Sequence, residues 1–123
     1  MLRISFACLC MAVALGCWLA IHYLQPNAAR PGWILRAVHG LAGASGLGLL
    51  LAAAWGPSEE PFFGATGGFA RSGLILLAAA LVLGLLFLLG WKWLGKMRSS
   101  VLILHACVAI TGFVLLSGWY LNG

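Results

Sequence analysis

Four long apolar stretches take up most of this 123-residue chain. A helix that crosses the hydrocarbon of a bilayer needs about 20 predominantly apolar residues, and each stretch has that length. The stretches run from Ser5 to Leu24, Trp33 to Trp55, Ser72 to Lys92 and Ser100 to Leu121. The sequence therefore predicts an all-α integral membrane protein, with one domain over residues 1–123 that forms a four-helix bundle.

The composition excludes a water-soluble domain. Hydrophobic residues make up 63% of the chain and charged residues 7%, whereas roughly a quarter of the residues in ordinary soluble domains are charged. Too few residues remain outside the apolar stretches for a separate catalytic domain or a nucleotide-binding loop. The net charge of +5 sits beside helix ends, so we expect contact with the lipid bilayer and no binding to nucleic acid.

The basic residues predict how the helices are oriented across the membrane. Five of them lie in or near the first and third connections: Arg30, Arg36, Lys92, Lys96 and Arg98. The opposite side carries Arg3, Arg71, Glu59 and Glu60. Because Lys and Arg accumulate in cytoplasmic loops, both termini are expected outside and the first and third connections in the cytoplasm, most simply of a bacterial inner membrane.

The first apolar stretch also resembles a signal peptide that ends at a lipoprotein-like Cys17. Its apolar run continues past this cysteine to Tyr23, which is long enough to span the bilayer. We therefore expect it to be retained as the first helix.

The connections predict two helical hairpins. Pro26 and Pro31 mark a short turn after the first stretch, and residues 94–99 form a short basic connection before the last one. The middle connection, residues 56–71, is longer and rich in Pro and Gly. Helices joined by short connections lie antiparallel, so the second and fourth helices are expected to run parallel to each other.

An internal repeat relates the second and fourth stretches at an offset of 66 residues. Residues 39–50 and 105–116 both read His, small, any, any, small, any, hydroxyl, Gly, large apolar, any, Leu, Leu. Small residues and leucines match easily by chance, so the shared histidine, hydroxyl and glycine carry the weight. The two hairpins are therefore predicted to be copies of one unit, as in parallel-repeat membrane proteins.

The repeat places two histidines, His39 and His105, at matching depths of roughly 7 to 9 Å below the same face. Small residues follow each histidine at the i+4 and i+7 positions, which lie on the same helical face. These are Gly43 and Gly46 after the first histidine, and Ala109 and Gly112 after the second. Two imidazoles above a floor without bulky side chains suit a flat macrocycle whose iron both rings ligate.

Two arginines lie where they would meet the propionates of such a macrocycle. Arg36 is three residues before His39, and Arg98 is seven residues before His105. Acids are costly in hydrocarbon unless they reach the interface or meet cations. The alternative is that these arginines are ordinary anchors at the cytoplasmic face.

The four-helix plan and the His39 and His105 motifs resemble those of small four-helix membrane b-type cytochromes. This resemblance implies haem b, electron transfer from quinol or another reductant, and membrane redox subunits as partners. Many such cytochromes hold two haems with two histidine pairs, whereas this chain has three histidines. The resemblance therefore implies a single haem towards the cytoplasmic side.

Two other functions stay open at this stage. Histidines can bond backbone carbonyls and small residues can serve helix packing, which would suit a cofactor-free accessory subunit of a membrane complex. The three histidines could alternatively form a copper site, although His22 also suits an interfacial position without function. The carboxylates Glu59 and Glu60 lie across the bilayer from the histidines, so we expect an electron carrier rather than an independent enzyme.

Overall fold

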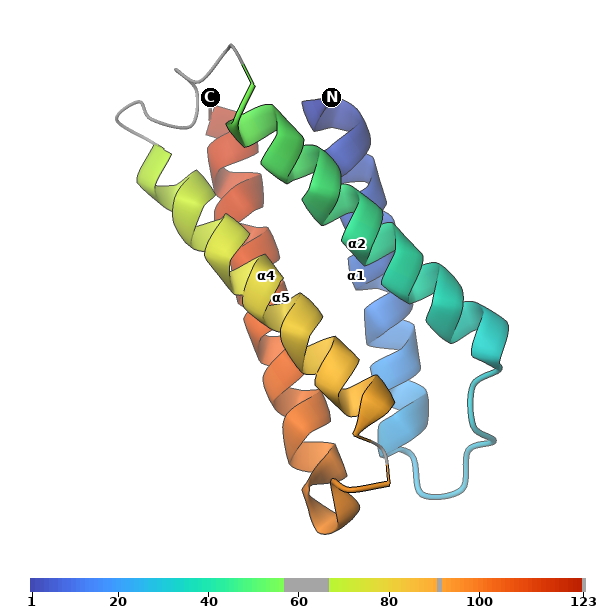
Figure 1. The fold of residues 1–123 in the computed structure, drawn as a ribbon. Helices are drawn as coiled ribbons and strands as arrows, with labels where there is room; N and C mark the ends of the chain where they lie inside the picture. The colour runs from blue at the N-terminus through green and yellow to red at the C-terminus, as the bar shows by residue number, and fades with distance from the viewer. Residues whose placement is uncertain (57–66, 91, 123) are drawn as a thin grey trace.

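The computed structural model describes residues 1–56, 67–90 and 92–122. These residues form four α-helices and no strand: α1 (Leu2–Leu24), α2 (Trp33–Ala54), α4 (Gly67–Leu89) and α5 (Arg98–Asn122), with a short 3-10 turn, η1 (Gly95–Met97), before α5 (Figure 1). Each of the four is long and apolar enough to cross a membrane. The chain is an all-α integral membrane protein, as predicted.

Proline and glycine set the helix ends around the two short connections. Gln25, at the end of α1, is extended, as expected of a residue before proline. Gly32 caps the start of α2 in a non-helical conformation. Gly95 has a positive φ of 47°, which glycine adopts without steric cost, and it turns the chain into α5.

Helix α4 lies earlier in the chain than the sequence predicted. It begins at Gly67 rather than Ser72 and ends at Leu89 rather than Lys92. Gly67 and Ala70 are buried, so packing stabilises a first turn that helix propensity alone disfavours. At the other end, the backbone N–H groups of Trp93 and Leu94 both donate to the Gly90 carbonyl, which forms a turn where the helix was expected to continue.

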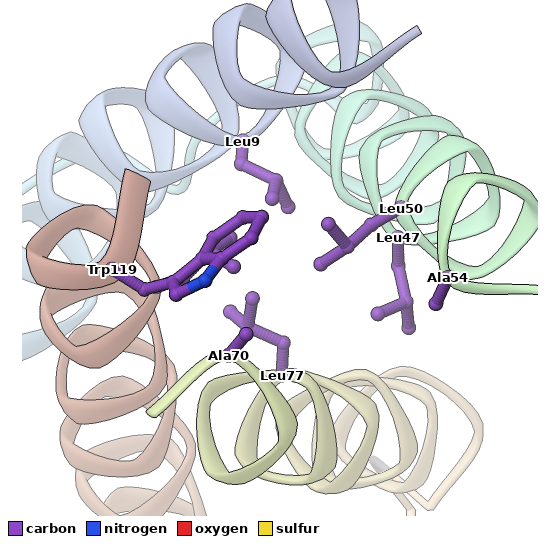
Figure 2. Packing of buried hydrophobic residues seen from close by; sticks show 8 residues of the cluster. Leu9, Leu47, Leu50, Ala54, Ala70, Leu77 and Trp119 are labelled. Carbon is purple, nitrogen blue, oxygen red and sulfur yellow. The ribbon is translucent and has the colours of Figure 1, made fainter. Parts of the chain in front are cut away.

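The four helices form two antiparallel hairpins (Figure 1). Helix α1 packs along α2, and α4 packs along α5, while smaller contacts join α1 to α5 and α2 to α4. Helices α2 and α5 therefore run parallel at diagonally opposite corners of the bundle (Figure 2). The two short connections lie at one end of the bundle, and both termini lie at the other.

The main hydrophobic cluster lies in the half of the bundle that carries the termini. It joins all four helices through Leu9, Leu47, Leu50, Ala54, Ala70, Leu77, Leu116 and Trp119 (Figure 2). Within this half, Ser5 is almost fully buried, and its hydroxyl donates a hydrogen bond of 2.7 Å to the Gly46 carbonyl. The histidines of the repeat stand outside this cluster.

Candidate functional site

The structure brings the two histidines of the repeat together. The ring centroids of His39 and His105 are 6.1 Å apart, and the ring planes are nearly perpendicular, at 85°. Both side chains are half-buried. Because His39 stands on α2 and His105 on α5, the pair joins the two hairpins across a diagonal of the bundle.

A backbone carbonyl on the neighbouring helix holds each imidazole. The Nδ1–H of His39 donates to the Ala12 carbonyl on α1 at 2.9 Å, and the Nδ1–H of His105 donates to the Ala80 carbonyl on α4 at 2.8 Å. A carbonyl oxygen can only accept a hydrogen bond, so in both rings Nδ1 carries the proton. The lone pair of each neutral imidazole is then on Nε2, where it can bind a metal.

Each ring also lies against a glycine one turn beyond its carbonyl partner. A Cβ added to Gly16 would stand 2.8 Å from Cε1 of His39, and a Cβ added to Gly84 would stand 3.1 Å from Cε1 of His105. The sequence carries this arrangement as Ala12 and Gly16 in α1 and as Ala80 and Gly84 in α4. We call each Ala–Gly pair, with the helix surface between its members, a histidine seat.

Sequence reasoning missed both seats. The signal was a small residue, three intervening residues and a glycine, repeated at an offset of 68 residues. This pattern is common in membrane helices because it lets helix backbones approach each other. It acquires a meaning for the site only when a histidine from the next helix is seen to lie on it.

The site also lies nearer the middle of the bundle than the count along α2 suggests. His39 is six residues, or about 9 Å, from Trp33 at the start of α2. Its carbonyl partner Ala12 is twelve residues, or about 18 Å, from Leu24 at the end of α1. The two counts differ because α1 extends further than α2 at this end.

The small residues predicted to form a cofactor floor pack within the hairpins. A Cβ on Gly46 would stand 2.8 Å from Cγ of Leu9 on α1, and one on Gly43 would stand 3.8 Å from the Ala12 Cβ. Gly112 lies in the same way against Leu76 of α4, at 2.9 Å. The face that carries these glycines packs on the partner helix of the same hairpin and not on the diagonal helix.

The two arginines assigned to the propionates lie towards the same end of the bundle as the short connections. Arg36 is exposed and lies about one turn before His39 on α2. Arg98 is the first residue of α5 and is half-exposed. Ala109, the fourth small residue of the predicted floor, is half-buried on α5, four residues after His105.

The third histidine does not join the pair. The Nδ1–H of His22 donates to the Trp18 carbonyl of its own helix at 3.0 Å, and its ring lies on the Trp18 ring with centroids 3.9 Å apart. Within residues 1–56, 67–90 and 92–122, no three His, Cys, Asp or Glu side chains gather where they would hold a metal ion. Glu59 and Glu60, for which the sequence predicts a position across the bilayer from the histidines, lie outside the described residues.

Comparison of the chain with known protein families, with curated proteins and with solved structures gives no match. The site is therefore interpreted from its own residues and their contacts.

Proposed function

We propose that this protein is a membrane electron carrier in which His39 and His105 ligate the iron of one haem b. The observation that carries the proposal is the pair of imidazoles from separate hairpins, each with Nδ1 held by a backbone carbonyl. Histidines that bind metals almost always donate their other ring N–H to such an acceptor, which fixes the tautomer and makes the ligand more basic. Two equivalent histidines prepared in this way favour a shared ligand.

The donor set fits one iron shared by the two rings. The ring centroids are 6.1 Å apart, and with Nδ1 bonded to a carbonyl each neutral ring keeps the lone pair of Nε2 for a metal. Two neutral imidazoles are an established ligand type for haem iron. A bound haem would supply one-electron chemistry at the iron.

The residues of the chain would hold this group and limit its chemistry. His39 and His105 would hold the iron with two imidazoles, a ligand set that favours electron transfer over the binding of a substrate to the metal. Arg36 and Arg98 lie towards the end of the bundle where the propionates would leave the hydrocarbon. We propose that this end faces the cytoplasm of a bacterial inner membrane, because five of the seven basic residues lie there.

One haem in one chain suits a subunit of a larger redox complex or a carrier between separate partners. We propose other membrane redox subunits, with quinol or another small reductant, as the partners. A single centre does not by itself carry electrons across the membrane. A partner would have to supply the next centre.

An absorption spectrum of the purified full-length protein tests the proposal directly. The protein would be expressed with excess haem precursor, and the reduced and oxidised spectra compared at a known protein concentration. We expect low-spin haem bands at close to one haem per chain. A protein that is folded and helical but lacks these bands, also after addition of haem, contradicts the proposal.

Two observations favour the second candidate, a cofactor-free accessory subunit. The bonds from both imidazoles to backbone carbonyls also satisfy these rings without a cofactor. Gly40, Ala44 and Gly48 follow one another at four-residue intervals on an exposed face of α2, and a Cβ at either glycine would meet no atom within 4 Å. Such a face permits close approach of another membrane helix. This candidate predicts association with a membrane complex in the absence of any haem spectrum.

A further inference from the structure

We infer that Gly16 and Gly84 are positioning residues that fix the tautomer of His39 and His105. Each glycine leaves a helix carbonyl open to an imidazole from the neighbouring helix, so both histidines offer Nε2 to a ligand. The link to haem iron rests on the proposed function. The effect on the imidazoles themselves concerns only contacts within this chain.

Helix geometry explains why the glycine follows the acceptor by four residues. In an α-helix the carbonyl of residue i accepts a hydrogen bond from the N–H of residue i+4, so residue i+4 stands beside that oxygen. The carbonyl has a second lone pair, which a donor from another helix can use. With glycine at position i+4, no Cβ obstructs that approach. Ala12 with Gly16, and Ala80 with Gly84, both have this spacing.

The distances show that the space is filled by the imidazole. The Cβ of an alanine at position 16 would overlap the His39 ring at 2.8 Å, and at position 84 it would crowd the His105 ring at 3.1 Å. The ring would have to leave the helix surface, and the bond from Nδ1 to the carbonyl would lengthen. Without that bond, a neutral imidazole is free to carry its proton on either nitrogen.

The same contact occurs in both hairpins although the chain path differs. The hydrogen-bonded alanine and histidine are 27 residues apart in the first hairpin and 25 in the second. A fixed sequence spacing therefore does not impose the contact. In both copies Nδ1 bonds the carbonyl of an alanine that precedes a glycine by four residues. A shared role for the two imidazoles requires this likeness.

Nuclear magnetic resonance of the histidine nitrogens tests this inference without haem. The full-length protein, labelled with 15N histidine and placed in lipid nanodiscs, would be compared with Gly16→Ala, Gly84→Ala and a control, Gly48→Ala. In the wild-type protein we expect His39 and His105 as Nδ1–H tautomers. Gly16→Ala should shift His39 towards a mixture and leave His105 unchanged, while Gly84→Ala should do the reverse, less strongly because its contact is longer.

The control shows the effect of an added methyl group that contacts nothing. Gly48 is on the same helix as His39, but a Cβ there meets nothing within 4 Å, so Gly48→Ala should leave both tautomers intact. The inference is overturned if the wild-type rings are not Nδ1–H tautomers, or if Gly16→Ala and Gly84→Ala leave them unchanged. An equal change in all three variants also overturns it. If Gly16→Ala does not fold, the milder Gly84→Ala decides the matter at His105.

Haem titration of the same variants distinguishes this inference from the proposed function. If haem binds, loss of a ligand's hydrogen-bond partner should weaken affinity by roughly 10- to 100-fold in Gly16→Ala and leave Gly48→Ala unchanged. Wild-type protein that binds no haem but shows the selective tautomer changes contradicts the haem proposal and supports the positioning role. Wild-type protein that binds haem with equal affinity in all variants overturns the positioning role alone.

Discussion

The ring centroids of His39 and His105 are 6.1 Å apart, although their helices, α2 and α5, occupy opposite corners of the bundle. The imidazoles reach the centre because each lies on the helix beside it, on α1 for His39 and on α4 for His105. The hydrophobic cluster that joins the hairpins lies in the other half of the molecule. A ligand shared by the two rings would therefore link the hairpins where this cluster does not.

Removal of either paired histidine should abolish low-spin haem. His39→Ala or His105→Ala would take away one of the two residues proposed to hold the iron, so the absorption bands of low-spin haem should disappear. His22→Ala is the matched control, because the His22 ring bonds the Trp18 carbonyl of its own helix and its loss should leave the spectrum nearly intact. Loss of haem in His22→Ala together with retention in His39→Ala would show that α1 supplies a ligand instead.

A bulky residue at Gly46 or Gly112 should separate the helices of one hairpin. At Gly46 even a Cβ would overlap the Leu9 side chain, and at Gly112 it would overlap Leu76. Gly46→Leu and Gly112→Leu should therefore lower the free energy of unfolding by about 1 to 3 kcal/mol or more, measured by denaturation in mixed micelles. Haem occupancy should fall as a consequence.

Gly48→Leu is the control for this prediction, since position 48 has open space around it. It should insert and bind haem normally. Haem loss in Gly48→Leu, with full stability and occupancy in Gly46→Leu and Gly112→Leu, would contradict the contacts of Gly46 with Leu9 and of Gly112 with Leu76.

The hydroxyl of Ser5 should contribute measurably to the first hairpin. Ser5 is 1% exposed, and its bond to the Gly46 carbonyl joins α1 to α2. Ser5→Ala should lower the free energy of unfolding by about 0.6 kcal/mol, and at most about 1.7, the range found for interhelical bonds in membranes. Ser117→Ala is the comparison, because that hydroxyl bonds the Phe113 carbonyl of its own helix. An equal effect of both substitutions would contradict a specific role for Ser5 between helices.

The basic connections should face the cytoplasm. Reporter fusions after Gly123 should read as outside, and fusions within the connections that carry Arg30 and Lys96 should read as cytoplasmic. The opposite readings would place the histidine pair towards the outer face. The redox partners that the site can meet would then change with it.

Local properties of the sequence were sufficient to predict the four spans, the two hairpins and the matching depths of His39 and His105. The length of an apolar run, a proline after a helix and a repeat at a fixed offset each need no knowledge of neighbours. A helical period also places Gly43 and Gly46 on the face of His39. It could not say which helix that face contacts, because periodicity defines a face but not its partner.

Tertiary packing decided that partner. The face of His39 meets α1, so Gly46 accommodates Leu9, and the imidazole is held by Ala12 and lies on Gly16. Packing also extended α4 back to Gly67, where glycine propensity opposes a helix but burial stabilises it. The two histidine seats could not be predicted from the sequence for the same reason. An alanine and a glycine four residues apart become a site only when a histidine from another helix, 25 or 27 residues from the alanine, lies on them.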